Sequence, residues 1–370
     1  MAETLIHKNS LGNLQIISVC STAFQEFFIT VNCSSTKQIT KSINDLKDLL
    51  VKSNAAVVKF DCFGLVSRAV TGVLNKIPDM KALPLTWVAG DNGEKPKLFG
   101  MQVYAISGAP VQTIYSGKKP VARVFRNNEG TYCLLGGITG NSRRASEAAQ
   151  AEQTFVNMEK ALAKAGMRAT DIVRTWFYNR DILKWYGAFN KIRNTFFVKN
   201  GVYKKLLPAS TGIGGSNQYD TALIAGVLAI KPVRNRMTIT ELVSPEQCAA
   251  PRYGSSFSRA IEICTPQDCR VIISGTASID RHGKTVHQGD IQKQIAQTMK
   301  VVASLLRSRG MNLSHVVRGI VYVEKPAYVR HFQEYCRKKL GMQLPVVVSC
   351  NTICRHDLLF EIEIDALAAR

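Results

Sequence analysis

Three acidic residues alternate with apolar residues near the end of the chain, in the stretch FEIEID at residues 360–365. Side chains of a β-strand alternate between its two faces, so Glu361, Glu363 and Asp365 share one face of the expected strand. A carboxyl group buried in a cleft has a raised pKa and can donate a proton near neutral pH. One of these acids is therefore a candidate proton donor, and a solvated strand face is the alternative.

Other residue types that support catalysis or metal binding occur without the partners that they need. Cys354 and His356 lie two residues apart, but no His/Asp pair that would activate a cysteine nucleophile is identifiable. His282 and His287 form a close histidine pair, and no third metal ligand is evident. The glycine-rich stretches GITG and GIGG complete no Walker or dinucleotide pattern. We predict no metal and no organic cofactor.

The chain is strongly basic. Its 370 residues carry a net charge of +21, which favours anionic partners, either nucleic acid or a small polycarboxylate. The basic residues are scattered, and the densest runs are SRR, YKK and CRKK, so we do not expect nucleic-acid binding; a solvated basic surface is the other explanation. No apolar run has the length of a membrane span, and the N-terminus lacks the features of a secretory signal. We predict a cytoplasmic protein with no membrane partner, whose ten cysteines are reduced.

The elements that must position the acids are repeated along the chain. Residues 161–178 read ALAKAGMRATDIVRTWFY and residues 305–322 read LLRSRGMNLSHVVRGIVY. Both carry Gly-Met, four residues and then Ile-Val-Arg or Val-Val-Arg. A weaker third copy, LLVKSNAAVVKFDCFG, has Val57, Val58 and Lys59 in the matching places. Self-similarity at a long period is typical of repeated structural units.

The same pattern flanks each copy: two strands and an amphipathic helix precede it, and a Leu-Pro and two strands follow. The apolar stripes of the helices are Ile39, Ile43, Leu46 and Leu50; Phe155, Met158 and Leu162; and Ile291, Ile295, Val302 and Leu306. We predict an α+β fold of three β-β-α-β-α-β-β units, at residues 1–108, 109–245 and 246–370. Closed around a threefold pseudo-axis, they would form a single-chain pseudo-trimer with three non-equivalent clefts, which we expect to be a monomer.

The unit resembles the trimeric Rid-type deaminases, the YjgF group. VIISGTASI is similar to their strand with Ser-Gly, and IEIDALA is similar to their final strand. That family binds a substrate carboxylate with the arginine of Pro-Ala-Arg-Ser/Thr. Here LPAST has Ser210 and LPVVVS has Val347 in the place of that arginine. The resemblance implies the fold, and the missing arginine argues against imine deamination.

A three-unit chain with LPASTGIGGSN, SFSRA, SGTASI, HQGD and CRHDLLFEIE resembles the chorismatases over essentially its whole length. These enzymes release pyruvate from chorismate, a dianion with an enol ether, and the trimeric chorismate mutases have a similar architecture. The essential glutamate of the family lies in the C-terminal strand, seven residues after a cysteine, and Cys354 and Glu361 have that spacing. The resemblance implies that Glu361 is the general acid and that Cys354 lines the substrate pocket. A buried structural cysteine is the alternative.

Further substrate contacts follow from the resemblance, because chorismate has two carboxylates. Arginine is suited to bidentate contact with a carboxylate, and the candidates are Arg193, Arg259 and Arg355. Tyr178 ends the strand RTWFY and is expected to reach across to the third unit. The alternatives are arginines that solvate a surface and a tyrosine in the core.

The stretch SGTAS is relevant to the contacts with substrate and to the identity of the reaction product. Gly275, Thr276 and Ala277 are expected to offer backbone N–H groups to the substrate, with close packing as the alternative. A cysteine at the place of Cys354 resembles the chorismatase branch that forms 3-hydroxybenzoate, whereas Ala277 stands where that branch has glycine. We give Cys354 more weight and predict 3-hydroxybenzoate plus pyruvate. The alternatives are hydrolysis to a dihydroxycyclohexadiene carboxylate and, in another class of function, a basic Rid-like protein that binds RNA.

Overall fold

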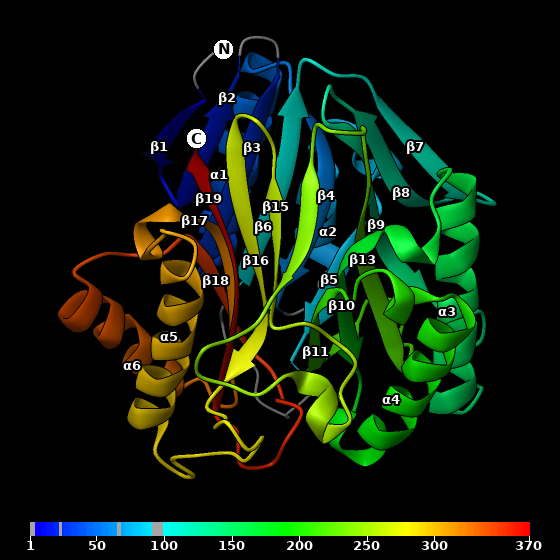
Figure 1. Cartoon of the computed structure of the whole chain (residues 1–370). Coiled ribbons are helices and arrows are strands. Elements are labelled where there is room, and N and C mark those ends of the chain that lie inside the picture. The colour runs from blue at the N-terminus through cyan, green and yellow to red at the C-terminus, as the bar shows by residue number, and fades with distance from the viewer. Residues whose placement is uncertain (1–3, 22–23, 65–67, 91–98) are drawn as a thin grey trace.

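The computed structural model describes residues 4–21, 24–64, 68–90 and 99–370. Within these residues the strands form three mixed sheets, of seven, six and six strands, and each sheet contacts both of the others. The seventh strand of the first sheet, β12 (Ser216–Asn217), comes from the second unit. The helices lie at the periphery, outside the sheets (Figure 1). The predicted three-unit α+β fold is confirmed.

The elements run in a closely similar order in each unit. The first unit contains β1 (Leu5–Leu11), β2 (Leu14–Cys20), β3 (Gln25–Cys33), α1 (Thr36–Lys52), β4 (Ala56–Phe63), α2 (Arg68–Leu74), β5 (Thr86–Ala89) and β6 (Phe99–Ser107). The second contains β7 (Val111–Ser116), β8 (Lys119–Arg126), β9 (Gly130–Thr139), α3 (Glu147–Lys164), β10 (Ile172–Asn179), α4 (Ile182–Lys199), β11 (Ala209–Gly214), β12 and β13 (Leu223–Pro232). The third contains β14 (Thr238–Leu242), β15 (Ala260–Cys264), β16 (Asp268–Ala277), α5 (Ile291–Arg307), β17 (Val316–Val323), α6 (Tyr328–Tyr335), β18 (Val346–Cys350) and β19 (Phe360–Ala369).

The first strand of each unit, β1, β7 and β14, is an addition to the predicted order. Each is an edge strand in its sheet. Most residues of β1 and β14 are exposed, so these strands lack the alternation of apolar residues by which the other strands are recognised. Strand β14 pairs with β15, so the third sheet begins upstream of residue 246. The unit boundaries at residues 108 and 245 stay a prediction.

The predicted apolar stripes of the long helices are buried. Ile43 and Leu46 of α1, Met158 of α3 and Ile295 of α5 are at most 1% exposed, and they pack into the core between helix and sheet of their own unit. A side-chain cap begins each of these helices: Ser35, Ser146 and Asp290 accept a hydrogen bond from a backbone N–H of the first turn.

Corresponding positions of the three units meet at the centre of the molecule. Phe63, Tyr178 and Tyr322 stand at the same register in β4, β10 and β17. The ring centroid of Phe63 lies 6.0 Å from that of Tyr178 and 6.4 Å from that of Tyr322. The hydroxyl oxygens of the two tyrosines are 3.2 Å apart. The three sheets therefore surround a common axis, as expected of a pseudo-trimer.

Candidate active site

The acidic face of β19 points into the protein. Glu361 is 5% exposed and Glu363 is fully buried, while Asp365 is half-buried. The alternating residues Phe360 and Ile362 pack in the core between α5 and the third sheet. The face is therefore not a solvated one, and each acid needs a physical reason to be there.

Glu361 lines a pocket between the second and third units. Its walls come from α4 and β11 of the second unit, from the segment before β15, and from β16 and the segment before β19. The lining residues are Tyr186, Arg193, Ser210, Gly212, Ser255, Phe257, Arg259, Gly275, Ala277, Ile279, Cys354, Arg355, Leu358 and Glu361.

The pocket holds Glu361 in its protonated form near neutral pH. Burial and, after it, the nearby charge of Glu363 raise the pKa of Glu361 to about 8. Arg174, Arg259 and Arg355 act in the opposite direction and do not outweigh these two effects. A carboxylic acid with this pKa can donate a proton at pH 7 and recover it afterwards.

Glu363 is instead held as a carboxylate. Burial opposes its ionisation, but the charges of Arg174 and Arg318 and hydrogen bonds from Thr211 and Trp176 lower its pKa. Its Oε2 lies 2.8 Å from Nη2 of Arg174, and its Oε1 lies 2.9 Å from Nη2 of Arg318 and 2.8 Å from Nε1 of Trp176. Two guanidinium groups and an indole thus fix a negative charge two residues from Glu361.

Three predicted arginines are brought together around Glu361. Arg193 and Arg259 are buried and Arg355 is half-buried. Backbone and amide oxygens orient them: Nη2 of Arg193 donates to Asn190, Nε of Arg259 to the Cys248 carbonyl, and Nη1 of Arg355 to the Gly283 carbonyl. Among the lining residues described, Glu361 is the one acid. With Glu361 protonated, the pocket is cationic and suits a dianionic ligand.

The stretch SGTAS contributes in a different way from the one predicted. A Cβ at Gly275 would lie 2.1 Å from Oε1 of Glu361, so a glycine is needed for the acid to fit. The Gly275 N–H donates to Oγ1 of Thr211, and Oγ1 of Thr276 donates to the Ser274 carbonyl. Gly275 and Ala277 line the pocket and Thr276, on the opposite face of β16, does not. The Gly275 N–H thus donates to Thr211. The sequence predicted instead that this N–H contacts the substrate.

Cys354 lines the pocket beside Glu361. Burial and, after it, the proximity of Glu361 raise the pKa of the thiol to about 12, although Arg355 and a hydrogen bond with Tyr186 act in the opposite direction. The side chain is therefore a neutral thiol at physiological pH. A thiol in this state is a poor nucleophile but can fill space and exclude water.

Tyr178 lies apart from the pocket. It reaches the third unit, as predicted, but its hydroxyl contacts that of Tyr322 in the central aromatic group. Sequence reasoning missed Tyr186 and Phe257, which line the pocket, because aromatic residues on a helix or in a loop carry no distinctive signal. It also missed the part played by Arg174, although this arginine belongs to the repeated Val-Arg motif.

The acid is present in one unit only. Glu361 pairs with Tyr322 of β17, and the residues at the same register in the other two units are Ile224, opposite Tyr178, and Gly100, opposite Phe63. The three clefts predicted to be non-equivalent thus differ at the position of Glu361.

Two regions of the chain match the model of the family described as Endoribonuclease L-PSP, residues 135–217 and 248–369, which together make up more than half of the chain. The chain belongs to the Endoribonuclease L-PSP family. The two matched regions cover most of the second and third units of this family member, and the first unit, expected to be degenerate, lies outside them.

The similarity to individual proteins covers a larger share of the chain than these two regions do. A 3-hydroxybenzoate synthase of Streptomyces hygroscopicus is 26% identical over 258 residues, which are 64% of this chain and 74% of that protein. A crystal structure of a chorismatase has a TM-score of 0.63 with 21% identity, and the match covers 84% of this chain and 92% of that chain. The three-unit architecture is therefore that of the chorismatase fold.

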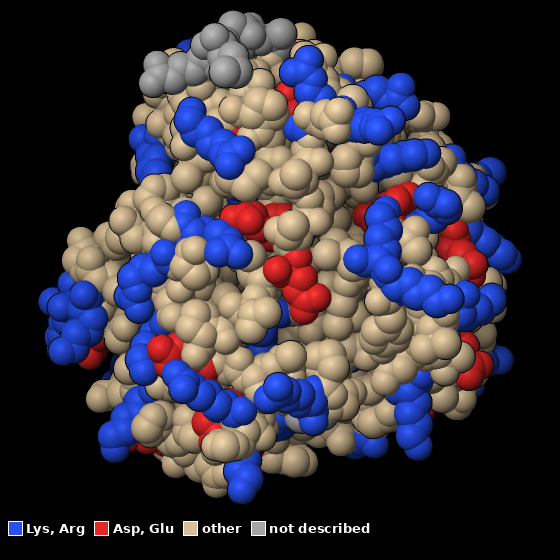
Figure 2. Space-filling model, viewed as in Figure 1, with Lys and Arg blue, Asp and Glu red and all other residues tan. Residues whose placement is uncertain are grey.

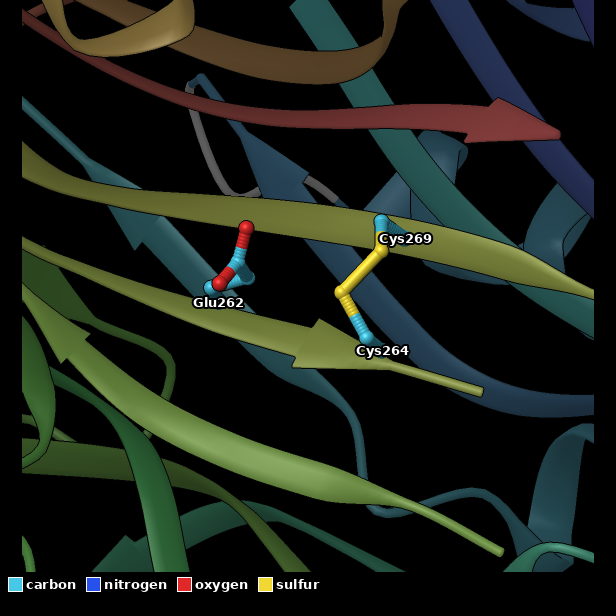
Figure 3. Close-up of side chains that lie close together, drawn as sticks. All are labelled: Glu262, Cys264 and Cys269. Atoms are coloured by element: carbon cyan, nitrogen blue, oxygen red, sulfur yellow. A yellow bond between two sulfur atoms is a disulfide. The ribbon is translucent and has the colours of Figure 1, made fainter. Parts of the chain in front are cut away.

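One prediction about the cysteines is wrong. Cys264 and Cys269 stand directly opposite each other in the hairpin of β15 and β16, and a disulfide joins them (Figure 3). Glu262 lies beside them, and in the described part of the chain this is the one group of three His, Cys, Asp or Glu side chains close enough to share a metal ion. With the sulfurs joined and Glu262 paired with Arg309, the group offers no thiolate ligand. The other eight cysteines form no disulfide.

The positive charge is spread over the surface. Figure 2 shows lysine and arginine side chains over the whole visible face, with no single stripe that would follow a nucleic-acid backbone. In the described part of the chain, no helix combines the length and the apolar character required to span a membrane.

Proposed function

We propose that this protein is a chorismatase, which releases pyruvate from chorismate with Glu361 as the general acid. The observation that carries the proposal is the protonated Glu361 in the lining of a pocket with three arginines. The similarity to a 3-hydroxybenzoate synthase and to a chorismatase structure supports it.

Binding relies on charge. Arg193, Arg259 and Arg355 hold the two carboxylates of chorismate, and their guanidinium groups are already oriented by backbone and amide oxygens. Little side-chain entropy is lost on binding, because two of the three arginines are buried before the substrate arrives.

Catalysis relies on the proton of Glu361. Its transfer to the terminal methylene carbon of the enol ether makes the ether carbon cationic, and the carboxylate that remains stabilises this cation. In one course the ring hydroxyl of the substrate attacks, and 3-hydroxybenzoate and pyruvate contain all the atoms of chorismate. In the other course a water molecule adds to the cation and gives a dihydroxycyclohexadiene carboxylate and pyruvate. We favour 3-hydroxybenzoate, because Cys354 lines the pocket.

The test is pyruvate release from chorismate by the wild type and by Glu361→Gln. We expect release by the wild type and none above background by the variant. The variant should fold, since a buried acid whose folded pKa lies above its unfolded value destabilises the fold as pH rises from about 4 to 8, and glutamine removes this loss. Absence of pyruvate from the wild-type reaction would refute the proposal.

Binding of RNA is a second candidate, favoured by the net charge of +21. It predicts an affinity that falls steeply with salt concentration and that Glu361→Gln leaves intact. A titration at low salt with single-stranded RNA distinguishes the two functions, since the chorismatase predicts no such affinity.

A further inference from the structure

A second cavity lies on the central axis, between the three sheets. It shares no lining residue with the Glu361 pocket. All three units contribute to its wall, for example Tyr104 of the first, Trp176 of the second and Ile272 of the third. We call this cavity the axial chamber.

Equivalent residues of the three units lie on either side of the axial chamber along the strands. At one end, Glu26, Tyr132 and Arg270 stand at the same register, opposite corresponding positions of the last strand of each unit. Nη1 of Arg270 lies 2.8 Å from Oε1 of Glu26, so an ion pair between the first and third units lies across this end. At the other end, the group of Phe63, Tyr178 and Tyr322 fills the axis.

An entry route leads to the Arg270 end. A hollow lies outside it, and Glu26, Tyr132, Asp268 and Arg270 line that hollow. Tyr132 and Arg270 line the axial chamber as well. The side chains of these two residues therefore separate the chamber from the hollow, and displacement of the Arg270–Glu26 pair would connect them.

The wall of the axial chamber is mainly apolar and aromatic. Phe28 and Tyr104 stack with a centroid distance of 5.0 Å, and Tyr132 and Trp176 face the same space. Aliphatic side chains such as Leu228 complete the wall. Aromatic walls favour a ring, because stacked and edge-to-face ring pairs attract each other beyond the effect of burying their area.

The charged groups of the wall are already compensated. Nζ of Lys59 pairs with Asp61 and lies 4.2 Å from the centroid of the Trp176 ring. Arg318 pairs with Asp365, with Nη1 2.9 Å from Oδ2. A charged ligand would lose its hydration without gaining an uncompensated partner, so a neutral molecule is favoured over an ion.

The axial chamber is also asymmetric. The residues opposite Lys59, Arg174 and Arg318 in the last strand of each unit are Tyr104, Leu228 and Asp365, and all three line the chamber. A homotrimer would present three copies of one side chain here. A phenol, an aliphatic group and a carboxylate together provide one polar side and one apolar side, which would orient a ligand that has a single polar group.

We propose that the axial chamber is a second ligand site, which takes a neutral single-ring aromatic molecule with one hydroxyl group and admits it past the Arg270–Glu26 pair. Protein interiors are densely packed, so an apolar cavity has unused contact surface. Water does not fill such a cavity, and small apolar molecules bind in it. The site is independent of the chemistry at Glu361 and does not rest on the proposed function.

The test uses 4-bromophenol and 4-bromobenzoate, each soaked into crystals of the full chain, with anomalous scattering to locate the bromine. We expect 4-bromophenol in the axial chamber and no 4-bromobenzoate there. Bromine from 4-bromophenol at the Glu361 pocket alone, or at neither place, overturns the proposal. Occupation of the chamber by 4-bromobenzoate rather than 4-bromophenol overturns it as well.

Fluorine NMR with 4-fluorophenol provides the solution measurement. Leu228→Phe fills part of the axial chamber, and we expect it to weaken binding at least about tenfold while pyruvate release is unchanged. Glu361→Gln is the matched control and should bind 4-fluorophenol as the wild type does. Loss of binding in Glu361→Gln with retention in Leu228→Phe would place the ligand in the other pocket and refute the proposal.

Discussion

Glu361 and Glu363 lie two residues apart on the same face of β19, both buried, and their pKa values are shifted in opposite directions. The difference comes from their partners: Arg174 and Arg318 hold Glu363 as a carboxylate, whereas Glu361 is influenced by its burial and by that neighbouring charge. A fixed anion next to a buried acid is a general way to keep a proton available near neutral pH.

The activity should depend on the protonated form of Glu361. Because the pKa of Glu361 is raised to about 8, kcat/KM for pyruvate release should be constant near neutral pH and fall above pH 8, by about tenfold per pH unit. The measurement is the initial rate of pyruvate formation at low chorismate concentration over a pH series. A rate that rises through this range would contradict a general acid and indicate a base.

Glu363→Gln should change the titration of its neighbour. The variant removes the negative charge that raises the pKa of Glu361, so the fall in kcat/KM should move to lower pH. Because Arg174 and Arg318 then lack a buried partner, the free energy of unfolding should decrease by roughly 3–5 kcal/mol.

Asp365→Asn is the matched control for this variant. Asp365 also pairs with Arg318, but it is half-buried and lies four residues from Glu361. The Asp365→Asn variant should leave unchanged the pH at which kcat/KM falls. An unchanged profile in Glu363→Gln, with activity retained, would show that Glu363 does not tune the acid.

Gly275→Ala should lower the activity, because the added methyl group would clash with the carboxyl group of Glu361. The added Cβ would lie 2.1 Å from Oε1 of Glu361 and 3.3 Å from Cγ2 of Thr211, so the carboxyl group must move. A displacement of this size should lower kcat/KM by about a hundredfold or more. Gly72→Ala is the control, since Gly72 lies in α2 and a Cβ added there has no neighbouring atom within 4 Å. This variant should keep its activity and should be as stable as the wild type or slightly more stable. Similar activity in both variants would contradict the position assigned to Glu361.

The parts of the structure that sequence could predict are those set by local periodicity. The buried stripes of α1, α3 and α5 and the acidic face of β19 follow directly from spacings of three, four and two residues. The alternation of residues between the two faces of a strand also explains why Thr276 does not line the pocket as predicted. Thr276 follows Gly275 directly, so the two residues lie on opposite faces of β16.

The parts that sequence could not predict depend on how units and strands meet. The Cys264–Cys269 disulfide requires the register of one hairpin, which places these residues directly opposite each other. The pairing of Arg174 with Glu363 joins the second unit to the third across 189 residues. Tyr178 lies at the centre, and not in the pocket, because three units pack around one axis.

In the proposed reaction, the product depends on whether water reaches the cation formed after protonation. Cys354 and Ala277 line the pocket together with Glu361, so both bear on the space next to the reacting carbon. The thiol of Cys354 is neutral, with a pKa raised to about 12 by burial, so it fills this space without competing for the proton. Removal of its sulfur would leave room for a water molecule.

We therefore expect the wild type to form mainly 3-hydroxybenzoate and Cys354→Ala to shift the products toward the dihydroxycyclohexadiene carboxylate, while pyruvate release continues. The measurement is chromatographic separation of the products of complete chorismate turnover. Cys133→Ala, in the core of the second unit and fully buried, is the control for loss of a buried thiol and should leave the product ratio unchanged. If the wild type yields only the diene, or if Cys354→Ala leaves the ratio unchanged, then Cys354 does not control water access. The role of Glu361 would stand in either case, because pyruvate is released in both courses.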